Sequence, residues 1–210
     1  MRIEPLGLEG AYLIRPQIFP DSRGVFLEIF NQPDFEETIG HPLEVAQVNC
    51  SSSRLGTVRG LHGVAIPPGQ ARYATCVRGA IIDIVVDTRI GSPTFGDHVP
   101  VRLDDERREA LYLAEGLVHG FAPLGDEATV VYLCSSIYSP AASFQINPFD
   151  PALSLPWPQH GEPILSDKDR AAPTLRQALD LGMLPTYAEC LALGEARRLR
   201  AGGGSREALR

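Results

Sequence analysis

The sequence has no arrangement of residues that is typical of a metal site. Its five histidines and four cysteines never occur as His-x-His, His-Glu-x-x-His or Cys-x-x-Cys. A metal-binding jelly roll needs several such ligands to converge on one ion. The cysteines are scattered as Cys50, Cys76, Cys134 and Cys190. This spacing argues against a zinc site and against a disulfide framework, and we expect reduced thiols.

Long apolar runs and an excess of positive charge are also missing. No apolar stretch approaches the roughly 18 residues of a membrane span. The first ten residues, MRIEPLGLEG, lack the apolar core of a signal peptide. The formal net charge of -7 gives no general attraction to nucleic acid or to an anionic membrane. We therefore expect a cytoplasmic protein with neither partner, in which local arginines must hold any bound anion.

The residues that are present predict a mainly β fold. Hydrophobic residues make up 44% of the 210-residue chain and charged residues 21%, which fits a globular core. From Tyr12 to about Tyr138, short apolar runs are broken by Gly, Pro, Asp and Ser. Frequent strands with long returning connections favour a jelly roll or a barrel.

Four strands can be placed from their patterns. The segments ARYATCV (71–77) and AIIDIVVDTRI (80–90) are predicted strands joined by a tight turn at Arg78 and Gly79. In the second, Ile82, Ile84 and Val86 take one face, and the intervening residues take the other. The segments EALYLAEGLVHGFAPL (109–124) and ATVVYLCSSIY (128–138) predict one strand each.

Helices are expected to be short and peripheral or C-terminal. One is predicted over 32–40, with Pro33 near its start and Gly40 at its end. Another follows the cap-like Ser166 in the segment 166–182 and begins near Pro173. The residues 185–210 predict a helix that fades into a mobile end over 201–210. We expect one domain over residues 1–190 and a helical or flexible tail over 191–210.

His62 lies between Arg59 and Arg72 in runs that otherwise predict buried strands. A histidine in such a run is most often a core or edge residue. Without a cluster of metal ligands, its chemical use would be proton transfer. The arginines are either solvated charges or, inside apolar runs, partners of an anion such as phosphate. Arg23, in FPDSRGVFLEIF, adds a third.

Two tyrosines and a charged segment offer further candidates. Tyr132 and Tyr138 would share a face if one strand carried both, and they either pack or supply a proton. The segment LSDKDRAAP (165–173) is either a capped helix start or a place where Asp169 folds back to orient a histidine. Composition and spacing do not show which histidine Asp169 would orient.

Nine segments, in register along nearly the whole chain, resemble the nucleotide-sugar epimerase family typified by dTDP-4-dehydrorhamnose 3,5-epimerase. They are DSRGVFLEIF (21–30), AQVNCSSS (46–53), GTVRGLH (56–62), PPGQARY (67–73), RGAIIDIVVDTRIGSPTFG (78–96), EGLVHGF (115–121), VYLCSSIYSP (131–140), DPALSLPWP (150–158) and PILSDKDRAAP (163–173). The segment LGMLPTYAEC (181–190) is similar to members that serve antibiotic deoxysugar pathways.

The resemblance implies a fold and a reaction. It implies a cupin-like jelly roll, a homodimer, and no metal or other cofactor. The substrate would be a dTDP-linked 4-keto-6-deoxyhexose, whose ketone acidifies the hydrogens on C3 and C5. The enzyme would remove one proton to form an enolate and return a proton to the opposite face, at C3, C5 or both.

The resemblance also assigns roles to residues. His62 matches the base, Asp169 its carboxylate partner and Tyr132 the acid that reprotonates the enolate. Eight positions match substrate contacts, and Tyr138 would help to line the pocket; the eight are Arg23, Glu28, Gln47, Asn49, Arg59, Arg72, His119 and Lys168. Phe19 and Phe26 would stack on thymine.

Five positions depart from the family pattern around the sugar end of the site. Gly63 and Val64 replace an aromatic–glutamine pair, Arg72 and Leu133 replace lysines, and Ser143 replaces a glutamate. The base, its carboxylate and the acid are kept. Two alternatives to epimerisation stay open: a 3,4-ketoisomerase acting through the same enolate, and a non-catalytic or metal-binding cupin.

Overall fold

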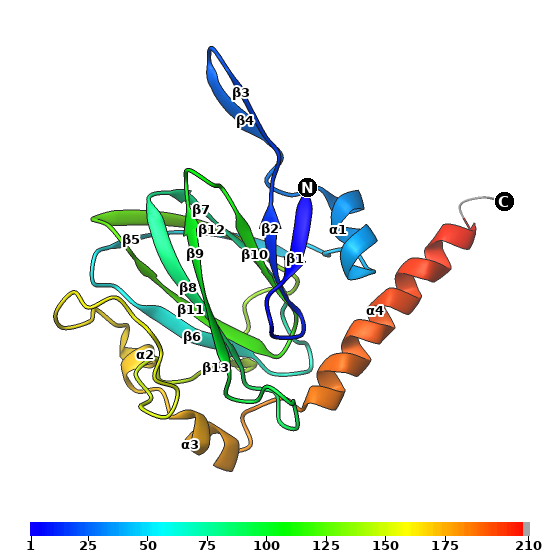
Figure 1. The fold of residues 1–210 in the computed structure, drawn as a ribbon. Coiled ribbons are helices and arrows are strands. Elements are labelled where there is room, and N and C mark those ends of the chain that lie inside the picture. Colours follow the sequence, from blue (N-terminus) through cyan, green and yellow to red (C-terminus); the bar gives the residue numbers. More distant parts are fainter. Residues whose placement is uncertain (208–210) are drawn as a thin grey trace.

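The computed structural model describes residues 1–207, and two antiparallel sheets form its body (Figure 1). The first sheet contains, in spatial order, β1 (Arg2–Pro5), β2 (Ala11–Arg15), β10 (Ala110–Leu113), β7 (Arg72–Arg78), β12 (Glu127–Cys134) and β5 (Gln47–Arg54). The second contains β13 (Ser143–Gln145), β6 (Arg59–Val64), β11 (Leu117–Pro123), β8 (Ala80–Asp87) and β9 (His98–Asp104). Two facing sheets with this strand order make a jelly roll, as predicted.

Apolar side chains fill the space between the sheets and cover their outer faces. The central cluster includes Leu111 and Val130 from the first sheet and Val85 from the second. A second cluster, with Ile84 and Val86, lies between the second sheet and residues 144–184. The alternation predicted for β8 is therefore confirmed, and each of its faces packs against a different cluster.

Glycines with positive φ carry the chain from one sheet to the other. Gly79, at φ +76°, joins β7 in the first sheet to β8 in the second, and a Cβ there would lie 2.4 Å from the carbonyl oxygen of Glu127. The predicted turn is confirmed, but the strands it joins do not pair. Gly116, at φ +88°, likewise separates β10 from β11. The prediction of one strand over 109–124 was therefore wrong, because the glycine ends the first strand and redirects the chain.

Within residues 1–207, four helices lie at the edges of the body: α1 (Gln32–Ile39), α2 (Asp167–Arg170), α3 (Leu175–Asp180) and α4 (Tyr187–Glu207). The first agrees with the predicted helix, since the Asn31 side chain accepts a hydrogen bond from the Asp34 amide and Gly40 closes the helix at φ +88°. Ser166 caps α2 in the same way. None of the helices in the described residues is long and apolar enough to cross a membrane.

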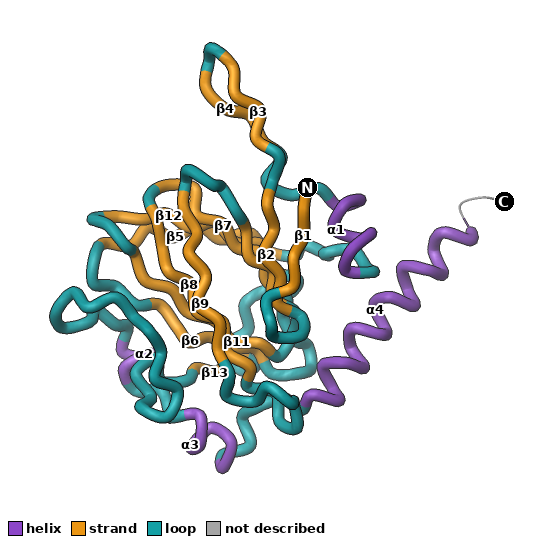
Figure 2. Tube along the Cα trace, viewed as in Figure 1, coloured by secondary structure: helices purple, strands orange, loops and turns teal. Residues whose placement is uncertain are grey.

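The long helix α4 leaves the body at an angle and ends away from the sheets (Figure 2). Its first half is anchored, because Cys190 is buried and Arg197 pairs with the buried Glu115 at 2.5 Å. The helix continues through Gly202 to Glu207, which agrees with a helical tail, and the mobility of residues 201–207 stays a prediction. Extending an existing helix costs only about 1 kcal/mol per glycine, far less than starting one. Residues 208–210 lie outside the described residues, and the predicted boundary at 190/191 falls within α4.

A two-stranded hairpin, β3 (Ile18–Asp21) and β4 (Gly24–Leu27), projects from the body (Figure 2). It forms a separate sheet of its own. Its apolar side chains are exposed, with Phe26 65% and Val25 50% accessible. An apolar hairpin held away from its own core indicates a surface that contacts something else.

Candidate active site

A cavity of about 390 Å³ brings together polar side chains from both sheets and from α2. Its lining comprises Gln47, Asn49, His62, Gly63, Gln70, Arg72, Tyr132, Cys134, Tyr138, Ser143, Gln145, Ser166, Lys168 and Asp169. All three residues predicted to act as base, carboxylate and acid therefore share one cavity. The structure gathers them from β6, α2 and β12.

His62 and Asp169 form the central pair of this cavity. The Nε2 atom of His62 lies 2.7 Å from Oδ1 of Asp169, although 107 positions separate the residues in sequence. An ionised carboxylate at this distance requires the proton on Nε2 and leaves the Nδ1 lone pair available as a base. Asp169 is 3% exposed, whereas the His62 side chain is 41% accessible. The carboxylate is thus buried behind an imidazole that is open to the cavity and to solvent.

Several hydrogen bonds keep Asp169 charged. Burial alone would raise the pKa of this carboxyl, but the bonds from His62 and Ser166 outweigh burial and hold the pKa below its usual range. The Ser166 hydroxyl lies 2.8 Å from Oδ2 and also accepts from the Asp169 amide as the helix cap. The first turn of α2 thereby positions the carboxylate that positions the base.

Tyr132 enters the cavity from the opposite sheet. It lies on β12 in register with Asn49 on β5 and Ala74 on β7, and its side chain also packs against the central apolar cluster. Burial raises the pKa of its phenol above the usual value, and the charges of Arg72 and Arg59 oppose that shift only in part. At neutral pH Tyr132 is therefore a protonated phenol that can donate a proton.

Arg72 supplies a fixed positive charge beside the two proton-transfer residues. It is 8% exposed, and its guanidinium donates to the His62 carbonyl at 2.8 Å and to Gln70 Oε1 at 3.0 Å. Gln70 in turn donates to the Ser136 carbonyl at 2.8 Å. Burial lowers the pKa of Arg72, but a guanidinium stays charged at any working pH. A developing negative charge in the cavity would meet this cation.

His119 forms a second imidazole–carboxylate pair deeper in the fold. Its Nδ1 lies 3.0 Å from Oδ2 of Asp83, and both side chains are buried. His119 pairs in register with His62 on the neighbouring strand, so the two rings belong to the same face of the sheet. Among the described residues, His119 is not part of the cavity lining.

Four predicted substrate contacts lie on the cavity wall. Gln47 donates to Asn49 Oδ1 at 2.7 Å and accepts from the Tyr138 amide at 2.7 Å. The Lys168 ammonium lies 3.3 Å from the Tyr138 hydroxyl. Because β12 ends at Cys134, the expected shared strand face of Tyr132 and Tyr138 does not exist. A loop brings Tyr138 to the same cavity instead.

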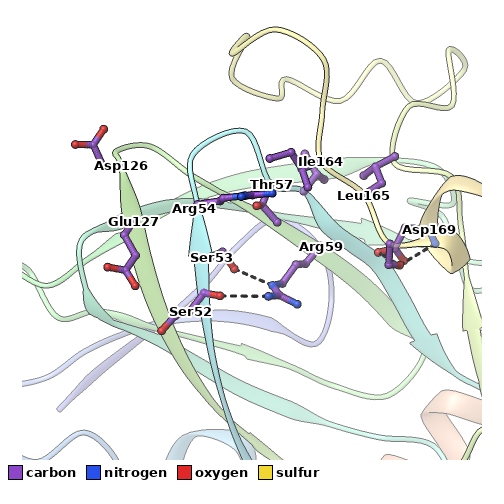
Figure 3. A pocket seen from close by; sticks show the side chains of 12 residues that line it. Ser52, Ser53, Arg54, Thr57, Arg59, Asp126, Glu127, Ile164, Leu165 and Asp169 are labelled. Carbon is purple, nitrogen blue, oxygen red and sulfur yellow. Dashed lines mark hydrogen bonds between the residues drawn. The ribbon is translucent and has the colours of Figure 1, made fainter.

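Arg59 faces an adjoining, more open cavity of about 740 Å³ that shares Ser166 and Asp169 with the first (Figure 3). Its guanidinium donates to Ser53 Oγ at 2.7 Å and to the Ser52 carbonyl at 3.3 Å. Figure 3 shows these bonds holding the side chain over the pocket, with Asp169 across from it. Arg59 therefore offers a directed cation next to the reacting pair.

Three predicted contacts line neither of these cavities: His119, described above, Arg23 and Glu28. Arg23 lies at the turn of the β3–β4 hairpin and pairs with Asp21 at 2.6 Å. Glu28 follows the hairpin and accepts from Asn31 at 3.4 Å. Phe19 and Phe26, expected to stack on a base, lie on the hairpin and contact each other. Within one chain, the hairpin residues and Glu28 do not reach the base or the acid.

The described residues contain no group of three or more His, Cys, Asp or Glu side chains that could hold a metal ion. The carboxylate and imidazole donors are instead distributed as two separate pairs.

Six lining residues were not predicted to belong to the site: Gly63, Gln70, Cys134, Ser143, Gln145 and Ser166. The sequence marks Gly63 and Ser143 only as departures from the family pattern, and Ser166 only as a helix cap. Gln70 precedes Arg72 by two positions, so strand parity could have placed it. Nothing in the local sequence marks Gln145, because its position depends on which strand β13 joins.

Comparisons with known proteins identify the family of the chain. The family model described as dTDP-4-dehydrorhamnose 3,5-epimerase matches residues 5–177. A 4-keto-6-deoxy sugar epimerase, NovW, from the novobiocin cluster of Streptomyces spheroides is 52% identical, with a TM-score of 0.89 over 90% of this chain and 95% of that one. The 3,5-epimerase of Mycolicibacterium smegmatis is 46% identical over 94% of this chain and 98% of its own length.

A third relative carries information about ligands. The 3'-monoepimerase ChmJ of Streptomyces bikiniensis, solved with dTDP-quinovose, is 50% identical, with a TM-score of 0.91 over 93% of this chain and 99% of that one. A double mutant of it, in which a histidine and a tyrosine are replaced, was solved with dTDP.

Replacing Asp169 by Asn should reveal how much this carboxylate contributes to the pH dependence of the free energy of unfolding. Because the folded-state pKa of Asp169 is depressed, its stabilising contribution is present above the unfolded value of about 4 and is lost as pH falls through the folded value. We expect Asp169→Asn to lower the free energy of unfolding by about 1–3 kcal/mol at pH 7. The deficit should shrink between about pH 5 and pH 2.

Urea unfolding followed by circular dichroism at several pH values measures this difference. Asp167→Asn, which changes an exposed carboxylate of the same helix, is the matched control and should show little deficit. A deficit for Asp169→Asn that stays constant from pH 7 to pH 2 would contradict the assignment.

Proposed function

The chain belongs to the dTDP-4-dehydrorhamnose 3,5-epimerase family, and on this premise we propose how its residues divide the work of epimerisation. The protein is an epimerase that acts at C3, C5 or both of a dTDP-4-keto-6-deoxyhexose in deoxysugar biosynthesis. The observation that supports our assignment of roles is the shared cavity of His62, Asp169 and Tyr132.

His62 is the base in this proposal. Its Nδ1 lone pair takes a proton from the carbon next to the C4 ketone, and the C–H electron pair moves onto the ketone oxygen to give an enolate. Asp169, bonded to Nε2, stabilises the imidazolium that forms. Arg72, whose charge is buried beside the pair, stabilises the enolate oxygen. No electron leaves or enters the substrate.

Tyr132 is the acid in this proposal. It faces the cavity from the sheet opposite His62, so its phenol can protonate the flat enolate on the other face. The phenolate then regains a proton from water, and His62 loses the one it took. Inversion requires a donor and an acceptor on opposite faces, which one bifunctional base cannot supply.

The polar groups outside the reacting centre suit the rest of the substrate. Arg59, held by Ser52 and Ser53 at the junction of the two cavities, is positioned for a phosphate of the diphosphate. Gln47, Asn49, Tyr138 and Lys168 line the wall of the cavity and supply further contacts, and His119 lies beside His62 on the neighbouring strand.

We also propose that the protein is a homodimer in which each hairpin completes the partner's site. The hairpin projects from the body (Figure 1), and its Arg23 and exposed Phe26 do not line the cavity of their own chain. Meanwhile β5 is an edge strand of the first sheet, with Val48 59% exposed, and it contributes Gln47 and Asn49 to the cavity. The open edge of β5 lies beside the cavity and can receive the hairpin of a second chain. In a dimer with a two-fold axis, each hairpin would contact the β5 edge of the other subunit.

A cytoplasmic location is consistent with the thiols. All four cysteines are free, and Cys50 is exposed, which suits a reducing compartment.

Deuterium exchange tests the function directly. Incubation with dTDP-4-keto-6-deoxyglucose in D₂O should place label at C3, C5 or both, as read by NMR. His62→Ala should slow exchange by about a hundred- to ten-thousand-fold because the base is lost, while dTDP binding persists. His160→Ala is the control, because it removes an exposed loop histidine that lines neither the 390 Å³ cavity nor the 740 Å³ cavity. Absence of label at both carbons with the wild-type protein would overturn the function.

Replacing Tyr132 should separate proton removal from inversion. Tyr132→Phe keeps the ring but loses the acid, so inversion should fall by about a hundred- to ten-thousand-fold. Label in recovered, uninverted substrate should fall much less, because His62 still forms the enolate. Product analysis by NMR measures both quantities. Tyr187→Phe, on α4, is the control; an unchanged inversion rate in Tyr132→Phe would refute Tyr132 as the acid.

Mixing two inactive variants tests the exchange of hairpins. Arg23→Ala and His62→Ala chains, unfolded together and refolded, should form mixed dimers with one intact site. Random pairing then restores about one quarter of wild-type activity, although each variant alone is nearly inactive. Light scattering should give the mass of a dimer. If the mixture is no more active than the separate variants, Arg23 does not act in the partner's site.

A further inference from the structure

The edge strand β13 places a glutamine directly beside the base. Gln145 on β13 pairs in register with His62 on β6, and both side chains line the 390 Å³ cavity. Directly opposed residues of an antiparallel pair point to the same face, with their Cβ atoms about 5 Å apart. Gln145 is therefore a neighbour of the reacting pair, although none of the roles assigned above falls on it.

A complementary pair on the other face of the sheet holds β13 in this register. Phe144 pairs with Gly63, and a Cβ on Gly63 would lie only 2.3 Å from Cζ of the Phe144 ring. The ring occupies the space in front of the glycine and is 5% exposed in the cluster that includes Leu61. Because a shift by one residue would put Phe144 into the polar cavity, this packing fixes the face that Gln145 takes.

The amide of Gln145 is free to bind a ligand, whereas the other two glutamine amides of the cavity are hydrogen-bonded within the protein. Gln47 is bonded to Asn49 and to the Tyr138 amide, and Gln70 is bonded to Arg72 and Ser136. The Gln145 amide has no hydrogen-bond partner within the described part of the chain. A half-buried amide beside a catalytic base, left without a partner, is a group that a substrate would satisfy.

The other side chains near it on this face are unsuited to the same task. Val64, next to His62 along the strand face, offers only methyl groups. Ser143, opposite Val64, already donates its hydroxyl to the Ser139 carbonyl at 2.8 Å. Gln145 thus provides both a donor and an acceptor where the sugar must lie, and it does so without adding charge next to the imidazole.

We propose that Gln145 is a specificity-determining residue whose amide hydrogen-bonds a sugar oxygen on the carbon adjacent to the one that faces His62. This inference rests on the proposed function. The bond fixes the rotation of the hexose over the base, and so sets the balance between proton removal at C3 and at C5. A methyl-bearing or shorter side chain would leave the ring free to present either carbon.

Two variants test the proposal. In Gln145→Ala, kcat/KM should fall about tenfold, as for the loss of one hydrogen bond, with most of the change in KM. The ratio of deuterium label at C3 to that at C5 should change, while dTDP affinity stays within twofold. Gln145→Glu keeps the shape but adds a carboxylate beside His62. It favours the imidazolium, so the acidic limb of the kcat/KM profile should move to higher pH.

The control and the contrary outcomes are specific. Gln159→Ala removes an exposed amide that lines neither of the two cavities and should change none of these quantities. Circular dichroism establishes that each variant is folded. If both Gln145 variants keep the wild-type kcat/KM, label ratio and pH profile, the inference is overturned. A loss of dTDP affinity equal to the loss of kcat/KM would also overturn it, by placing the amide at the nucleotide.

These outcomes are distinguishable from failure of the proposed function. If the wild-type protein incorporates no label, the epimerase assignment itself fails. If the wild type incorporates label and His62→Ala does not, but the Gln145 variants are indifferent, only the role of Gln145 fails.

Discussion

The hydrogen bond between His62 and Asp169 is the interaction on which the site depends. A carboxylate that is 3% exposed would be strongly destabilising without partners, and here the imidazole and the Ser166 hydroxyl provide them. The same bond ties the short helix α2 to strand β6. One contact therefore sets the protonation of the base, its orientation, and the docking of the segment that closes the cavity over the sheets.

The jelly roll can hold so polar a cavity because the two buried charges of its lining, Arg72 and Asp169, have partners. Arg72 is bonded to the His62 carbonyl and to Gln70, and Asp169 is bonded to His62 and to Ser166. These contacts satisfy the groups and also remove their rotational freedom. A substrate thus meets donors and acceptors that are already oriented, which is the condition under which electrostatic stabilisation of an enolate is most effective.

Much of this structure follows from local patterns, and the remainder depends on long-range pairing. Alternation along residues 80–87 and the caps at Asn31 and Ser166 are local physics, so they were predictable. The resemblance to a family supplied His62, Asp169 and Tyr132 as a set, which spacing alone did not. Neither the local pattern nor the family resemblance predicted Gln145. Its place beside the base depends on Phe144, which fills the space in front of Gly63. These two segments lie about eighty residues apart, so the pattern of either strand alone does not show that they fit together.

The 107 positions between His62 and Asp169 also affect the order in which the site forms during synthesis. At about 5–20 residues per second, a ribosome needs roughly 5–20 s to add them, so the strands that carry the imidazole and the phenol are made well before the carboxylate. A nascent chain can form the sheets and still lack the carboxylate that the base needs for activity. The base gains its carboxylate partner only with α2, which is made after every strand of the two sheets.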